Sequence, residues 1–261
     1  MRHALALEYD GRRFCGFQSQ PSACGVQDAV EAALASIAAA PVRVTAAGRT
    51  DAGVHATSQI VHFDAPVARP QTAWVRGVNA HLPEGAAVLW CTPVSAEFHA
   101  RLAARGRHYT YLLLNRPERP GLACGRVGWH HAPLDVEAMR EAAQCLHGTH
   151  DFSAFRAAQC QAKSPVKTLH RLEVARSASV IRFDFTADAF LHHMVRNIVG
   201  ALVEVGAGRR TAAWMPELLA AADRSRGAPT FASDGLYFVG ADYDARFALP
   251  PTRRDVPGFP A

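Results

Sequence analysis

Hydrophobic positions in the first hundred residues alternate between strand spacing and helix spacing. Residues 3–9 carry the pattern of a strand, and residues 25–40 place apolar side chains at helical intervals before Pro41. Further spacing of this kind predicts strands over 42–47, 58–64 and 86–94 and a helix over 70–81. The resulting order, β-α-β-β-α-β, is that of a ferredoxin-like unit.

The second half of the chain repeats this order with additions. The pattern predicts strands over 107–114, 126–131, 167–176, 179–187 and 236–240, and helices over 135–147, 190–205 and 211–222. We therefore predict an α+β protein of two ferredoxin-like (RRM-like) halves, residues 1–104 and 105–246. The halves are expected to form one extended antiparallel sheet with helices on one face and a central active-site cleft. The Pro-rich tail, residues 247–261, is expected to be loosely held.

The composition is that of a globular protein, with 49% hydrophobic and 20% charged residues. A net charge of +5 favours a polyanionic partner. The six cysteines include no CxxC pair, the N-terminus has no signal segment, and no apolar run reaches the length of a membrane span. These features predict a cytoplasmic, soluble protein with reduced thiols and no membrane association.

The stretch Gly48–Ala56 carries a concentrated set of functional side chains between two predicted strands. Arg49 precedes Asp51 by two residues, so both side chains project to the same face of an extended chain. A guanidinium beside a carboxylate keeps the carboxylate charged. This pattern suits a nucleophilic or basic carboxylate, but taken alone it is more typical of a surface turn with one ion pair.

Other catalytic chemistries find little support along the chain. The carboxylate nearest to Asp51 in sequence is Asp64, at the far end of the next predicted strand, and GxSxG, Walker A and GxGxxG motifs are absent. Paired histidines, as at 130–131 and 192–193, have no thiol or carboxylate at ligand spacing, so we predict no metal site.

Basic residues interleaved with aromatic ones suit an RNA partner. His193, Arg196 and Asn197 lie on the polar side of the predicted helix 190–205, which is either a solvated face or a wall of the cleft. Each basic cluster alone is more typical of an ordinary solvated surface, and only the three together, flanking one predicted cleft, favour RNA. The clusters are Arg101, Arg105 and Arg107; Arg156, Lys163, Lys167 and Arg171; and Arg209 and Arg210.

Several blocks, in the right order, resemble the tRNA pseudouridine synthase family that modifies the anticodon stem-loop, the tRNA pseudouridine(38–40) synthases. The resemblance covers nearly the whole chain, and Phe17 departs from it where the family has tryptophan. The blocks are Leu7-Glu8-Tyr9-Asp10-Gly11, Gly16-Phe17-Gln18, Gly48-Arg49-Thr50-Asp51-Ala52-Gly53-Val54-His55-Ala56, Val78-Asn79-Ala80-His81-Leu82-Pro83, Phe98-His99-Ala100-Arg101, Arg107-His108-Tyr109, Asp151-Phe152-Ser153-Ala154-Phe155-Arg156 and His192-His193-Met194-Val195-Arg196-Asn197-Ile198-Val199-Gly200.

This resemblance implies a cytoplasmic, homodimeric isomerase that converts uridine to pseudouridine in the anticodon stem-loop of tRNA without metal or cofactor. Asp51 matches the family's catalytic nucleophile, Arg49 its ion-pair partner, and Tyr109 the ring that stacks on the target base. Leu236 matches a hydrophobic residue that packs under the aspartate. Further tRNA contacts are expected from Arg101, Arg105, Arg107, Arg156, His193 and Arg196. The alternative is a non-catalytic RNA-binding protein of tandem ferredoxin-like modules.

Overall fold

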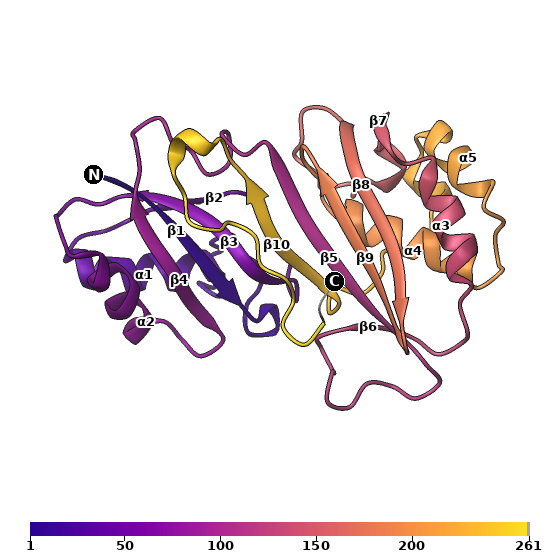
Figure 1. Cartoon of the computed structure of the whole chain (residues 1–261), viewed down its shortest axis with the longest axis horizontal. Helices are drawn as coiled ribbons and strands as arrows, with labels where there is room; N and C mark the ends of the chain where they lie inside the picture. The colour runs from indigo at the N-terminus through magenta and orange to yellow at the C-terminus, as the bar shows by residue number, and fades with distance from the viewer. Residues whose placement is uncertain (260–261) are drawn as a thin grey trace. The chain divides into compact units, whose positions relative to one another are not determined.

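The computed structural model describes residues 1–259 and divides the chain into two compact α+β units (Figure 1). The first unit contains Met1–Arg107 together with the chain from Tyr237 onward, and the second contains His108–Leu236. The last predicted strand and the tail, which the sequence pattern assigned to the second half and to a separate segment, therefore belong to the first unit.

The sheet of the first unit has the strand order β4-β1-β3-β10. Strand β1 (Arg2–Tyr9) lies between β3 (His55–Asp64) and β4 (Ala86–Pro93) and is antiparallel to both. Strand β2 (Val44–Ala46) pairs antiparallel with β3. Strand β10 (Leu236–Asp242) runs parallel to β3, so this sheet is mixed, although a purely antiparallel one was predicted.

The helices of the first unit follow the predicted apolar spacing with different boundaries. Helix α1 (Val26–Ala38) buries one face and ends where Ala39 adopts a left-handed conformation. The predicted helix over 70–81 is a π-helical segment (Ala73–Gly77) followed by the short helix α2 (Val78–His81). A Cβ on Gly77 would lie 2.8 Å from the Ile37 side chain, so glycine allows this segment to pack closely on α1.

The Pro-rich tail is held against the first unit, so the expectation that it is loosely held was wrong. Arg254 donates its backbone N–H to the Val239 carbonyl at 3.0 Å, next to an antiparallel bridge between Gly240 and Arg253. The Thr57 hydroxyl donates to the Arg254 carbonyl at 2.6 Å. Figure 1 shows this yellow segment running along the strands of the first unit. Side chains on β3 and backbone groups on β10 therefore fix the tail.

The second unit contains a sheet of order β5-β9-β8-β7. Its strands are β5 (Gly106–Asn115), β9 (Val180–Ala187), β8 (Val166–Ser177) and β7 (Gly148–Asp151), with β6 (Gly128–His130) parallel to β5. Strand β7 was not predicted because its four residues, Gly-Thr-His-Asp, are largely exposed and show no apolar alternation.

Helices of the second unit are α3 (Val136–Gln144), α4 (Met194–Gly206) and α5 (Trp214–Ala221). The Asp135 carboxylate accepts N–H bonds from residues 137 and 138, which confirms the predicted N-cap. Helix α4 packs on α3 and starts later than predicted, because His193 takes a left-handed conformation with φ +62°. No helix within residues 1–259 is long and apolar enough to cross a membrane. Short 3-10 turns lie at Gly11–Arg13, Ser153–Phe155, Arg224–Arg226 and Ala245–Phe247.

Candidate active site

A tight turn in the first unit presents Asp51. The Val54 N–H donates to the Asp51 carbonyl at 3.1 Å, and Gly53 between them has φ +81°. A positive φ at the third residue is the mark of a type II turn, and glycine adopts it without steric cost. The turn leads directly into β3, so the half-buried Asp51 side chain extends from a fixed strand end.

Thr50 anchors the chain immediately before this aspartate. Its buried hydroxyl shares a 2.8 Å hydrogen bond with the Tyr9 hydroxyl on β1. Burial raises the pKa of Tyr9 to about 12, so this phenol stays protonated in the neutral range. The Thr50 carbonyl accepts the Phe17 N–H at 2.9 Å, which ties the loop after β1 to the turn.

Gln59 and Gly11 hold the two ends of the motif. The Gln59 amide on β3 donates to the Gly48 carbonyl at 2.8 Å. A Cβ on Gly11 would lie 2.2 Å from the Val54 carbonyl oxygen, so only glycine fits there. A Cβ on Gly16, which has φ +95°, would lie 2.9 Å from the Thr50 carbonyl oxygen. The glycines of the N-terminal blocks thus allow a loop to pack directly on the Asp51 turn.

His55, the first residue of β3, is a buried part of the same framework. Its Nδ1 accepts the Gly11 N–H at 3.1 Å, and its ring stacks on Tyr237 with centroids 4.6 Å apart. The Asp10 carboxylate lies 3.3 Å from this Nδ1, and its hydrogen bonds from Arg12 lower the pKa of Asp10 to about 2. The sequence reasoning assigned no role to these residues. The sequence offered one indication of such structural polar residues, namely a polar side chain within an apolar strand pattern, as at Gln59.

A disulfide between Cys15 and Cys24 closes the loop that touches the Asp51 turn. The Cys15 N–H donates to the Cys24 carbonyl at 2.9 Å, and the two Cα atoms are 5.4 Å apart. The prediction of reduced thiols is therefore wrong for this pair. Nothing in their sequence separation of nine residues resembles a redox motif, and the proximity comes from the fold of the loop.

The predicted basic residues of the first unit differ in their surroundings. Arg49 is exposed, and its pairing with Asp51 stays a prediction. The Arg107 guanidinium donates to the Ala47 carbonyl at 3.3 Å and to the Ala104 carbonyl at 3.0 Å. It therefore braces the backbone next to the motif.

Arg105 and Arg101 are more exposed than Arg107. The exposed Arg105 pairs with Asp244. Arg101 is also exposed, and within residues 1–259 no carboxylate pairs with it. Of this basic cluster, Arg101 is the residue whose charge is least neutralised by the protein.

Tyr109 and Leu236 belong to the second unit. Tyr109 is half-buried on β5, and the edge of its ring meets Phe190 with centroids 5.0 Å apart at 81°. This contact restricts the orientation of the phenol. Leu236, the first residue of β10, is buried.

Arg156 and His193 are brought together through two neighbouring loops of this unit. The Ala157 N–H donates to the His192 carbonyl at 3.0 Å, and Arg156 donates to the Cys160 carbonyl at 2.8 Å. His193 follows directly as the residue before α4.

Arg196 and Asn197, on the first turn of α4, have structural partners. The Arg196 Nε donates to the Phe231 carbonyl at 2.8 Å. Asn197 is buried, donates to the Phe155 carbonyl at 2.8 Å and accepts from Thr230 at 2.7 Å. The polar side expected for this helix is therefore partly an interior hydrogen-bond network.

Comparison with known proteins gives a consistent set of matches. The family profile described as tRNA pseudouridine synthase matches residues 5–102 and 142–244. A protein of Thiobacillus denitrificans is 62% identical over 250 residues, covering 96% of each chain, and one of Dechloromonas aromatica is 61% identical over 255 residues, covering 98% of this chain and 97% of the relative. A Methylibium petroleiphilum protein is 58% identical over 250 residues, covering 96% of each chain. All three relatives carry the name tRNA pseudouridine synthase A.

Among solved structures, the "Crystal Structure of a Cbf5-Nop10-Gar1 Complex" aligns over 90% of this chain and 48% of that chain at 11% identity. Its TM-score of 0.37 is too low to bear on the fold.

Proposed function

Because this chain belongs to the tRNA pseudouridine synthase family, we propose that it isomerises uridine to pseudouridine in the anticodon stem-loop of tRNA, at positions 38–40. The relatives named above act, by their names, on tRNA. The alternative of a non-catalytic RNA-binding protein is not favoured by those matches. The net charge of +5 suits a polyanionic substrate.

The observation that carries the catalytic assignment is the turn around Asp51. Isomerisation breaks the bond between N1 of uracil and C1′ of ribose, turns the base, and joins C5 to C1′. A single carboxylate suffices to attack the sugar or the base, or to deprotonate the ribose. Fixing Thr50 through Tyr9 and Phe17 supports this role, because a catalytic group needs a position defined by its neighbours.

Further residues have supporting roles in the proposal. Arg49 is the ion-pair partner of the Asp51 carboxylate. Tyr109 stacks on the target base, and Phe190 holds its ring in place. Leu236 contributes apolar surface that limits access of water. Extrusion of the base costs a few kcal/mol, which phosphate contacts from Arg101, Arg105, Arg107, Arg156, His193 and Arg196 help to offset.

The proposed reaction requires neither metal nor cofactor, because it exchanges a C–N bond for a C–C bond without net redox change or hydrolysis. We also propose that the protein works as a homodimer in the cytoplasm. Sedimentation at micromolar concentration tests the dimer, and a monomer that remains fully active would contradict it. If the reaction needs no metal, the enzyme should still convert prefolded tRNA in the presence of excess chelator.

The decisive experiment uses tRNA transcript labelled with tritium at C5 of uracil, since that hydrogen leaves when C5 bonds to ribose. We expect tritium release from the wild type and a loss on the order of a thousandfold or more in Asp51→Asn. Asp64→Asn is the matched control, because Asp64 pairs with Arg2 at the far, exposed end of β3, the strand that follows the Asp51 turn. Full activity in Asp51→Asn would remove the catalytic assignment, and tRNA binding without tritium release would favour the RNA-binding alternative.

A further inference from the structure

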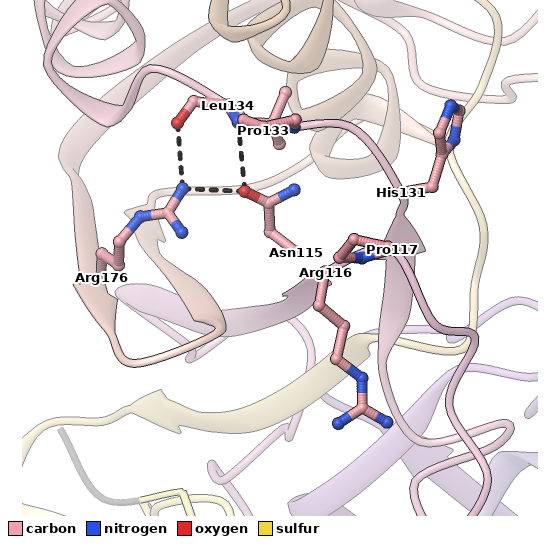
Figure 2. Close-up of a pocket in the computed structure, with 7 residues that line it drawn as sticks. All are labelled: Asn115, Arg116, Pro117, His131, Pro133, Leu134 and Arg176. Atoms are coloured by element: carbon pink, nitrogen blue, oxygen red, sulfur yellow. Dashed lines mark hydrogen bonds between the residues drawn. The ribbon is translucent and has the colours of Figure 1, made fainter.

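A cavity of about 230 Å³ lies in the second unit, at the end of β5 (Figure 2). Three basic side chains, Arg116, His131 and Arg176, contribute to its wall. None of these residues belongs to the predicted active site. The cavity is therefore a feature that the proposed catalytic function has not used.

Asn115 forms a rigid floor for this cavity. Its amide nitrogen donates to the carbonyls of His130 at 3.1 Å and Ala132 at 2.7 Å. Its amide oxygen accepts from Leu134 N–H at 3.2 Å and from Arg176 at 2.9 Å, and Figure 2 shows these last two bonds converging on one oxygen. The buried amide thus joins the end of β5 to the segment after β6 and to β8.

The two arginines of the wall keep their charge available to a ligand. One terminal nitrogen of Arg176 is held by Asn115 and by the Leu134 carbonyl at 3.0 Å. Arg116 donates only to the Glu118 carbonyl, at 3.2 Å. Among residues 1–259, neither guanidinium forms an ion pair with a carboxylate. Paired arginines elsewhere in this unit, such as Arg209 with Glu204, show that the surface does offer partners.

An exposed aromatic surface adjoins these charges. Trp129 is 39% exposed, and its indole N–H donates to the Arg116 carbonyl at 2.9 Å. The ring of His131 lies 6.1 Å from that of Trp129 and stacks on His130 at 5.4 Å. An indole this exposed, fixed beside Arg116, provides a stacking surface next to a cationic side chain that can bind phosphate.

We propose that the backbone of the tRNA substrate binds at this cavity, with separate phosphates contacted by Arg116 and Arg176 and a neighbouring unpaired base stacked on Trp129. The identity of the RNA rests on the proposed function, whereas the recognition chemistry rests on the cavity. Arginine forks match phosphate geometry, and an indole face accepts any base. The site would thus add affinity without adding sequence preference.

The test measures the affinity of unmodified tRNA transcript by fluorescence anisotropy at several salt concentrations. We expect Trp129→Ala to weaken binding about tenfold, as loss of one stacked base does. Arg116→Gln should weaken binding several-fold and reduce the slope of log affinity against log salt by about one. Both side chains lie on the surface, and a thermal unfolding midpoint matching the wild type confirms that each variant is folded.

Arg69→Gln is the matched control, because the exposed Arg69, like Arg116, donates its Nε–H to a backbone carbonyl, that of Ile37 at 3.1 Å, and belongs to none of the basic clusters named above. Unchanged affinity in both pocket variants would overturn the proposal. So would an equal loss in the control, which would indicate diffuse attraction by any surface arginine. Tritium release separates this test from the catalytic one: a wild type that binds tRNA without turnover would refute the proposed function, while the affinities still decide on the pocket. In an active enzyme, the pocket variants should raise KM and leave kcat unchanged.

Discussion

His62 on β3 makes the stability of the first unit sensitive to mild acid. Its Nδ1 accepts the Ala100 N–H at 3.2 Å, so the folded protein requires this nitrogen to be unprotonated. The side chain is 6% exposed and meets the Phe98 ring edge-on. Burial, with the nearby charges of His99 and Arg2 acting in the same direction, lowers the pKa of His62 to about 4. The Phe-His-Ala-Arg block at 98–101 is thus anchored through a neutral imidazole.

The contribution of His62 to the free energy of unfolding follows from the difference between its pKa in the folded protein and the ordinary value of 6.5. As the pH falls below about 6.5 the unfolded chain binds a proton on His62, whereas the folded chain does so only near pH 4. The contribution of this residue is complete above pH 6.5 and is lost progressively down to pH 4. The free energy of unfolding falls by about 3 kcal/mol in total, and about 2 kcal/mol of this decrease has occurred by pH 5.

Urea unfolding at pH 7.5 and pH 5 measures this effect. In His62→Gln, whose amide oxygen retains an acceptor for Ala100, the loss of unfolding free energy between these pH values should be about 2 kcal/mol smaller than in the wild type. The exposed His81 serves as control, since His81→Gln should leave the pH dependence unchanged. An identical pH dependence in wild type and His62→Gln, or an NMR titration of His62 near pH 6.5, would refute the reasoning.

Three further predictions concern the Asp51 turn and the tail. The Gly16→Ala variant must place a Cβ 2.9 Å from a carbonyl oxygen of the turn, at a φ of +95°. The kcat for tritium release should therefore fall at least tenfold. The control Gly121→Ala, whose Cβ would have no atom within 4 Å, should behave as wild type. Replacing both Cys15 and Cys24 by serine should lower kcat several-fold, because the loop loses the cross-link beside Gly16; turnover equal to that of the oxidised wild type would contradict this. Removing residues 249–261 should lower the thermal unfolding midpoint by several degrees, because the tail's hydrogen bonds and buried side chains are lost. An unchanged midpoint would show that these contacts are not stabilising.

Much of the fold could be predicted because its signals are local. Apolar alternation predicted β1, β8 and β9 to within two residues, and Asp135 as a predicted N-cap correctly marked the start of α3. Features without a local signal were missed. Strand β7 has no apolar alternation, and the tail is fixed by a Thr57 hydroxyl that lies 197 residues away in sequence from its acceptor.

The candidate site likewise combines features that the sequence predicted with contacts that it did not. The glycines, Arg49 and Asp51 stand together in the sequence, and a resemblance between whole motifs pointed to their chemistry. The anchors of the turn are different, since Tyr9 and Thr50 are 41 residues apart and meet only after β1 and β3 have paired. Likewise, the Cys15–Cys24 bond depends on how one loop returns on itself. Spacing along the chain does not encode such contacts.

Because β10 comes from the end of the chain, synthesis and folding proceed in different orders. The second unit is continuous and can complete its structure as soon as residue 236 has left the ribosome. The N-terminal unit begins first, yet the start of β3, at His55 and Ala56, lacks a partner strand on one edge until β10 emerges. The nascent protein therefore carries an open strand edge at the start of β3 until β10 has been made, and unpaired strand edges favour aggregation. The stacking of His55 on Tyr237, beside the Asp51 turn, can form only after β10 has been made.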